Sequence, residues 1–161
     1  MAVYTTAGST FAIATGASAN SSPANSAAYI ALTWTNVGEW ENGGEFGDSA
    51  SVVSFTSIAD SRVRKRKGSR NAGTMELTFG FDALDAGQIA LRAAVDSQFR
   101  FNFRIQLNDQ ADANDTDSFF YFGAYVMKAT VVPGGADDIT KMNVTLEIDT
   151  AITTVAATVV P

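Results

Sequence analysis

The sequence predicts a mainly β fold, an antiparallel β-sandwich or barrel of about seven strands with one α-helix packed on its flank. The first observation is that apolar and polar residues alternate at period two in several segments, as strands with one buried face require. The second is that turn residues separate these segments at short intervals. The third is a stretch with helical spacing of apolar residues, at residues 82–96.

Alternation is clearest in residues 98–107, where every second residue is large and apolar. Three further segments alternate in the same way: residues 27–34, 74–81 and 140–148. In chain order, the predicted inward residues are Ala28, Ile30, Leu32, Trp34, Met75, Leu77, Phe79, Phe81, Phe99, Phe101, Phe103, Ile105, Leu107, Met142, Val144, Leu146 and Ile148. The intervening residues, Asn102 among them, are predicted to face outward.

Two more segments are predicted to be strands, although they do not alternate in this way. Residues 51–58 are uncharged and rich in β-branched side chains, and we expect them to pair with residues 74–81 as a hairpin with a long loop. Residues 119–127 are apolar on both faces, so we expect this strand to be covered by its own core and by something else.

The helix at residues 82–96 is predicted from its start signal and its spacing. Asp82 is a good N-cap, with Asp85 three residues later. The apolar residues that follow recur at the spacing of a helix: Leu84, Ile89, Leu91 and Val95.

Missing residue types limit the chemistry available to this chain. It has no cysteine and no histidine. It therefore lacks disulfides, a thiolate nucleophile, the usual general base and the common ligands of zinc and copper. We expect a protein that is not an enzyme and uses no cofactor. Its start lacks the positive charge of a secretion signal, and no apolar run approaches the roughly 18 residues of a membrane span.

Charge is distributed unevenly along the chain. A long loop predicted at residues 59–73 holds six of the 11 basic residues: Arg62, Arg64, Lys65, Arg66, Lys67 and Arg70. Outside residues 62–70, five basic residues stand against 17 acidic ones, a net charge of −12. Charged residues make up only 17% of the chain, which is low for a soluble domain and indicates that other subunits cover much of the surface.

The basic loop allows three interpretations. Its cations would neutralise several phosphates of a nucleic acid, and a localisation signal has a similar composition. No aromatic residue lies among residues 62–67 to stack on bases, which argues against an ordered single-strand site. Identical copies of the chain supply acidic neighbours, so we favour a contact between subunits.

The two ends of the chain are uncharged, with no charged residue before position 39 or after position 149. Disordered tails are usually charged and poor in hydrophobic residues, whereas the first 25 residues include Phe11 and Ile13. We therefore predict an N-terminal arm (1–26), a β domain (27–150) and a C-terminal arm (151–161), with both arms ordered on neighbouring subunits. Flexible ends are the alternative.

Residues 108–117 form an acidic loop. Its oxygen ligands are Asp109, Asp112, Asn114, Asp115 and Asp117, the donor type that calcium prefers. The loop lacks the central glycine and the final glutamate of an EF-hand, and Asp and Asn are also common in solvated turns. Both a metal site and a solvated turn fit these residues.

Three pieces of the sequence resemble the major tail tube proteins of long, non-contractile-tailed bacteriophages. They are Val37-Gly-Glu39, Gly73-Thr-Met-Glu-Leu-Thr78 and Phe81-Asp-Ala-Leu-Asp-Ala-Gly-Gln88. The likeness extends over residues 34–149. It implies a structural virion protein that is made in the host cytoplasm, is built into the phage tail, and assembles into stacked hexameric rings through which DNA passes during ejection.

The resemblance also implies partners: a tape-measure protein within the bore, a terminator at the head end and a distal tip protein. DNA must pass without specific binding, and because each phosphate contact adds affinity, acidic and small polar residues should line the bore. Our candidates for that lining are Glu76, Thr78, Glu147 and Asp149. The basic loop then serves as the contact between rings, and no membrane is involved.

The alternative function is a binding module, a β-sandwich that recognises carbohydrate on a virion or cell surface. Trp34, Trp40, Tyr121 and Tyr125 supply rings that can stack on sugars. Their positions in predicted strands favour the core for most of them.

Overall fold

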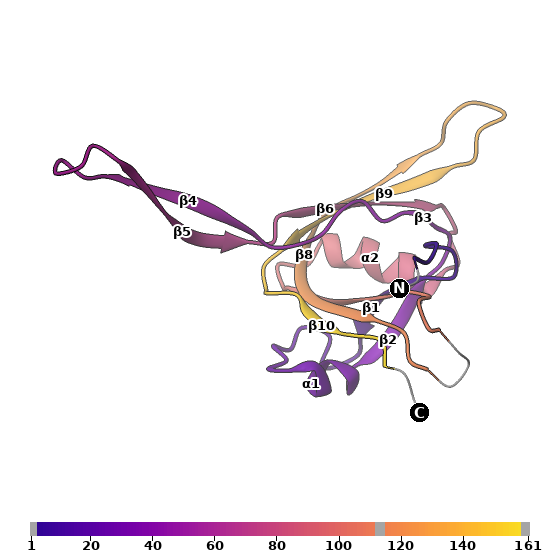
Figure 1. The fold of residues 1–161 in the computed structure, drawn as a ribbon. Coiled ribbons are helices and arrows are strands. Elements are labelled where there is room, and N and C mark those ends of the chain that lie inside the picture. The colour runs from indigo at the N-terminus through magenta and orange to yellow at the C-terminus, as the bar shows by residue number, and fades with distance from the viewer. Residues whose placement is uncertain (1–2, 112–114, 159–161) are drawn as a thin grey trace.

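The computed structural model describes residues 3–111 and 115–158 and confirms the mainly β prediction (Figure 1). The elements in chain order are β1 (Thr10–Thr15), α1 (Ser26–Ile30), β2 (Thr33–Val37), β3 (Trp40–Asn42), β4 (Ser49–Thr56), β5 (Val63–Asn71), β6 (Thr74–Gly80), α2 (Ala86–Val95), β7 (Phe101–Gln106), β8 (Phe119–Val132), β9 (Lys141–Ile148) and β10 (Thr153–Val155). Neither of these helices is long and apolar enough to cross a membrane.

The main antiparallel sheet curls until its distant strands touch. Its order is β2-β1-β7-β8-β9-β6-β3, with β10 paired to β8, while β4 and β5 form a separate hairpin. Strand β8 pairs with β7 along its first half and with β9 along its second, with a register shift between Val126 and Lys128. The rings of Phe11 on β1 and Phe79 on β6 have centroids 5.9 Å apart, although three strands separate them in the sheet. This contact requires a closed, sandwich-like curvature.

The alternating strands supply the core as predicted. On β6 and β9 the inward residues Met75, Leu77, Phe79, Met142, Val144, Leu146 and Ile148 are all buried. Strand β7 is shorter than predicted, since it begins at Phe101 and leaves Phe99 exposed. Asn102, predicted to face outward, is buried instead, because its amide donates to the carbonyls of Ala19 and Ser21 at 3.0 Å each.

Residues 27–34 do not form the predicted strand. Residues 26–30 form α1, whose N-cap Asn25 accepts a hydrogen bond from the backbone nitrogen of Ala28 at 3.0 Å, and β2 begins only at Thr33. In so short a segment, the hydrogen bond of the helix N-cap outweighs the tendency of alternating residues to form a strand. Tyr29 of α1 is buried and stacks on Tyr121 of β8 with centroids 5.2 Å apart. The chain itself therefore supplies part of the second cover expected over residues 119–127.

The predicted N-terminal arm, residues 1–26, includes β1, which belongs to the β domain and not to an arm. This strand lies between β2 and β7 in the main sheet, and Phe11, Ala12 and Ile13 are fully buried. Small and uncharged residues mark an interior strand here, covered on both faces. At the other end, β10 pairs with the chain's own β8, and residues 159–161 lie outside the described ranges.

Helix α2 starts later than predicted, because Asp85 and not Asp82 is its N-cap. One carboxylate oxygen of Asp85 accepts from the backbone nitrogen of Gln88 at 2.7 Å, and the other accepts from that of Gly38 at 3.2 Å. Leu84 precedes the helix and is 89% exposed, whereas Leu91 is fully buried. The helix packs on β1, β2 and β8, where it closes the core.

Gln88 joins three backbone segments inside the fold. Its side chain is fully buried. The amide nitrogen donates to the carbonyl oxygens of Gly80 at 2.7 Å and Gly38 at 3.3 Å, and the amide oxygen accepts from the backbone nitrogen of Asp82 at 3.0 Å. Gln88 therefore satisfies partly buried backbone groups at the end of β6, at the turn after β2 and at the approach to α2.

Replacing Gln88 by leucine should destabilise the protein strongly. Leucine has a similar volume but leaves these backbone groups without partners, and each such group costs about 1–3 kcal/mol, so we expect a loss of about 3 kcal/mol in the free energy of unfolding. Urea denaturation measures this loss. Gln98→Leu is the matched control, since Gln98 is exposed and should change stability by no more than about 0.5 kcal/mol. Equal effects of the two substitutions would contradict the role given to Gln88.

Candidate assembly surfaces

The basic segment predicted as a loop at residues 59–73 is mostly a strand. Residues 63–71 form β5, which pairs with β4 in a register that runs from Ser49 opposite Asn71 to Thr56 opposite Val63. The expected pairing of residues 51–58 with 74–81 is therefore wrong, and β6 pairs with β3 and β9 instead. Residues 57–62 suffice to reverse the chain, so β4 pairs with the strand that follows it most closely.

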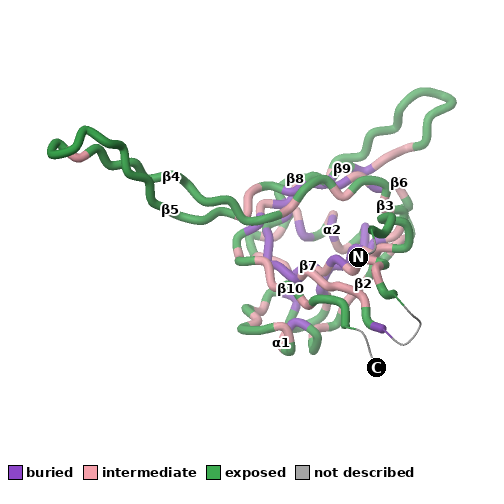
Figure 2. The backbone as a smooth tube through the Cα atoms, viewed as in Figure 1, coloured by how far each residue is buried: buried purple, intermediate pink, exposed green. Residues whose placement is uncertain are grey.

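The β4–β5 hairpin projects from the body, at the left of Figures 1 and 2. All of β4 is exposed, and so is β5 apart from the half-buried Gly68. An isolated two-stranded hairpin is at best marginally stable in water. A ribbon this exposed on both faces is therefore suited to lie against another molecule.

The two faces of the hairpin differ in chemistry. Residues directly opposite each other in an antiparallel pair point to the same side. Phe55 is opposite Arg64 and Val53 is opposite Arg66, and we call these four residues the arginine face. On the other side, which we call the lysine face, Ser54 is opposite Lys65 and Val52 is opposite Lys67.

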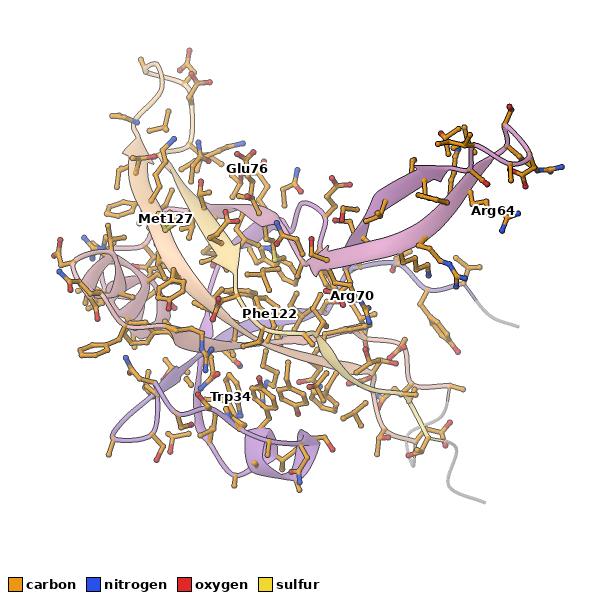
Figure 3. The ribbon with its side chains drawn as sticks, turned by 90° about the vertical axis from the view of Figure 1, so that its left-hand side faces the viewer. Trp34, Arg64, Arg70, Glu76, Phe122 and Met127 are labelled. Atoms are coloured by element: carbon orange, nitrogen blue, oxygen red, sulfur yellow. The ribbon has the colours of Figure 1, made fainter. Side chains whose placement is uncertain are left out.

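Two ion pairs stabilise the hairpin only weakly. Arg64, near the free end, pairs with Asp60 at 2.6 Å, and Arg70, at the root, pairs with Asp48 at 2.6 Å (Figure 3). The hydrogen bond from Arg64 lowers the pKa of Asp60 below its ordinary value. Exposed pairs of this kind contribute little to stability. Most of the positive charge is therefore available to a partner.

Three of the four candidates for the bore lining share one surface. Glu76 and Thr78 on β6 and Glu147 on β9 point outward, opposite the buried residues of those strands. Glu147 accepts a hydrogen bond from the hydroxyl of Thr74 at 2.7 Å, and Glu76 lies away from the core that holds Phe122 (Figure 3). The fourth candidate, Asp149, follows the end of β9 and pairs with Arg100 at 3.0 Å.

Two arginines of the β7 region are held within the chain. Arg100 pairs with Asp149 and donates to the hydroxyl of Ser22 at 2.6 Å. The guanidinium of Arg104 lies 5.3 Å from the Trp34 ring centroid and 5.9 Å from that of Phe119. Burial lowers the pKa of Arg104. The sequence interpretation places both side chains on an outward face, to pair with acids across an interface, whereas in the structure Arg100 pairs with Asp149 of its own chain.

The acidic loop uses two of its carboxylates to fix its own backbone. Asp109 accepts from the backbone nitrogen of Ser118 at 2.7 Å and from its hydroxyl at 2.6 Å, and these bonds lower the pKa of Asp109. Asp117 accepts from the backbone nitrogens of Asp109 and Gln110 and from the amide of Gln106. Asp112 and Asn114 lie outside the described residues. Within those residues, no group of three or more Asp or Glu side chains is placed to hold a metal ion.

The aromatic residues considered for sugar binding do not form an exposed platform. The ring nitrogen of Trp34 donates to the carbonyl of Tyr29 at 3.1 Å, and its ring packs on the buried Tyr121. Trp40 packs on Phe11 in the core. Tyr125 alone of the four is more than a third exposed. These contacts give most of the rings a packing role.

A second projection extends β8 and β9 beyond the body at the upper right of Figure 1. A groove at its tip is lined by Val132, Gly134, Asp137, Asp138, Ile139 and Lys141. Ile139 is 76% exposed, and Lys141 pairs with Glu41 at 2.6 Å. The tip therefore combines apolar and acidic groups, on the side of the body opposite the basic hairpin.

The fold is that of subunits from tubes and tube ends. One similar structure is a PVC sheath/tube terminator of an extracellular contractile injection system, with a TM-score of 0.70, 12% identity and coverage of 97% of this chain and 99% of that chain. The cap of the anti-feeding prophage tube has a TM-score of 0.65 and 15% identity, covering 97% and 95%. The SPP1 tail tube subunit has a TM-score of 0.63 and 14% identity, covering 91% and 75%.

The family follows from the sequence itself. The model of the phage tail tube protein family (TTP) matches residues 2–157, and the chain belongs to this family. No curated protein matches the sequence. The chain is therefore a structural component of a phage virion, in its tail tube, and the prediction of that family is confirmed.

Proposed function

We propose that this tail tube protein forms hexameric rings, which stack into a hollow tube through which DNA passes during ejection. The observation that carries the proposal is the β4–β5 hairpin, a ribbon with both faces exposed. It concentrates positive charge on a chain that is acidic elsewhere. A second copy of the chain supplies both the support and the negative charge that such a ribbon needs.

The distribution of charge supports head-to-tail stacking. In a heterologous contact one face of a subunit meets a different face of the next, so the assembly extends in one direction. The basic hairpin leaves the body at the left of Figure 1, whereas the β8–β9 tip extends at the upper right and the described ends of the β7–β8 connection lie at the lower right. The described acidic residues of these two connections are Asp109, Asp115, Asp117, Asp137 and Asp138. Opposite charges on opposite sides favour a stack over a closed dimer.

We propose that the outward face of β6 and β9 lines the bore. Glu76, Thr78 and Glu147 lie on it, and their acidic or small polar groups repel phosphates or leave them unbound. Lys128 of β8, opposite Thr145 in the register, and Lys141 of β9 share this face. Because Lys141 is already paired with Glu41, the two glutamates outnumber the one remaining lysine. We place Asp149, with its partner Arg100, at the margin of the bore.

We further propose the partners of such a tube: a terminator at the head end, a distal tip protein, and a tape-measure protein within the bore. Solved chains with this fold include a sheath/tube terminator and a tube cap, which supports tube ends that match the ring face by using the same fold. The residues flanking β1 and β10 are proposed to contact neighbouring subunits. The protein has a structural role and no enzymatic one in this proposal.

Negative-stain electron microscopy of the purified protein at high concentration tests the proposal. We expect rings and tubes of uniform diameter, because the contacts proposed here need no other protein. Sedimentation of the same sample should show a large assembled fraction. A monodisperse monomer under all conditions would contradict the proposal, and glycan binding by such a monomer would favour the carbohydrate-binding alternative.

A further inference from the structure

We propose that the arginine face of the hairpin binds the acidic tip of the β8–β9 hairpin in a second copy of the chain. The proposal rests on the stacked tube proposed above and specifies which surfaces meet in it. In this contact Arg66 and Arg64 pair with Asp137 and Asp138, and Arg64 exchanges its exposed pair with Asp60, which contributes little to stability. Phe55 and Val53 cover the apolar part of the tip groove. The lysine face points away from this contact.

The composition of the two hairpin faces decides which one is buried. Arginine and aromatic residues are enriched at the centres of protein interfaces, whereas lysine is depleted there. A guanidinium is weakly hydrated and binds carboxylates through two parallel hydrogen bonds, but an ammonium is strongly hydrated. Phe55, which is 66% exposed in the free chain, stands beside Arg64 on one face. The other face carries Ser54 and Thr56 beside the lysines, and its apolar residues, Val52 and Val63, are smaller than Phe55 and include no aromatic ring.

The tip of the β8–β9 hairpin complements the arginine face in charge and in its combination of charged and apolar groups. Asp137 makes no hydrogen bond or ion pair with any residue that the structure describes, and Asp138 uses one oxygen to accept from the backbone nitrogen of Gly135 at 2.8 Å. The groove between them and Val132 includes the exposed Ile139. Lys141, the cation of the groove, is already paired with Glu41. Carboxylates beside apolar side chains are what Arg64, Arg66 and Phe55 require.

The geometry of the chain allows the contact only between copies. The two hairpins leave opposite sides of the body (Figure 1), so the arginine face cannot reach the tip of its own chain. The eight residues of β4 span roughly 26 Å when extended, long enough to cross onto a neighbour. Each copy then offers one arginine face and one acidic tip, and the contact repeats along the tube.

Charge reversal of one face at a time tests the proposal. Arg64→Glu with Arg66→Glu should lower the fraction of protein in tubes at least about tenfold, because this change places like charges together at a desolvated contact. Lys65→Glu with Lys67→Glu makes the same change of charge on the neighbouring residues and should lower the fraction less than about threefold. Sedimentation and negative-stain microscopy measure both variants beside the wild type.

A charge swap provides the second arm of the experiment. Asp137→Arg with Asp138→Arg should block assembly alone and restore it when combined with Arg64→Glu and Arg66→Glu. Equal losses from the two hairpin variants, or no recovery in the swapped protein, would overturn the assignment of these surfaces. Neither result would contradict the proposal that the chain forms tubes. A wild-type protein that forms no tubes at all would instead overturn the proposed function, and this contact with it.

Discussion

A protein with Arg64→Glu, Lys65→Glu, Arg66→Glu and Lys67→Glu should remain folded and form no tubes. The four side chains are exposed on both faces of the β4–β5 hairpin, so their replacement leaves the core unchanged. It reverses the charge that we expect to hold the hairpin on an acidic neighbour, and like charges across an interface cost several kcal/mol per contact. Electron microscopy of the variant at a concentration where the wild type assembles measures the effect.

Circular dichroism and thermal unfolding of the free subunit show whether the fold survives this change. We expect an unchanged β spectrum and a midpoint within a few degrees of the wild type, since exposed substitutions usually change stability by less than about 0.5 kcal/mol. The matching glutamine variant, which removes the charges without reversing them, should assemble partially and more readily at high protein concentration. Normal tubes from the glutamate variant would remove the role given to the hairpin.

Phe11→Ala should unfold the protein or bring it close to unfolding. Phe11 is fully buried and its ring contacts those of Trp40, Phe79 and Phe103. Removing a ring from such a site costs about 3–5 kcal/mol, against a total of about 5–15 kcal/mol for a domain of this kind. Urea denaturation measures the loss.

Val3→Ala is the control for this substitution, because Val3 is 96% exposed and should have almost no effect on the subunit. The pair separates two views of the N-terminal segment. If residues 10–15 were an arm that orders only on a neighbour, Phe11→Ala would weaken assembly and spare the isolated subunit. A subunit as stable as the wild type would therefore contradict the position of β1 in the core.

The strands that have one solvent-exposed face and one buried face are predictable from the sequence. On β6 and β9 each buried residue follows an outward polar one, and the predicted cores of both strands are confirmed. Strand β1 was not predicted because it is covered on both sides and does not alternate, and because Thr and Ala surround Phe11 and Ile13, so its composition resembles that of a tail. Strand β5 was not predicted for the opposite reason. Both of its faces are exposed within one chain, and its alternation of arginine and lysine carries no contrast in hydrophobicity.

The pieces that carry the family resemblance gain a physical meaning in the structure. Residues 37–39 and 81–88 lie far apart in sequence, yet Gln88 and Asp85 both bond to Gly38. A side chain at Gly87 would come within 2.7 Å of the Cα atom of Val37, so glycine is required where the helix meets this turn. The motif thus fixes α2 on the sheet, and the surface charges that we propose for assembly lie elsewhere.

The candidate assembly surfaces were partly predictable. Clustered positive charge in residues 62–70 is plain from sequence, and so is its contrast with an acidic chain. The division of that charge into an arginine face and a lysine face depends on the register of β4 and β5, which the sequence does not reveal. The groove at the tip of β8 and β9 depends on how far these strands extend past the body, and composition carries no signal for that length.

A cryo-electron microscopy reconstruction of tubes assembled from this chain tests the central claim most directly. We expect rings of six subunits, with each β4–β5 hairpin lying on a subunit of the adjacent ring and with Glu76 and Glu147 facing the bore. Hairpins that extend into solvent without touching a neighbour, or a bore lined by another face of the sheet, would contradict the account.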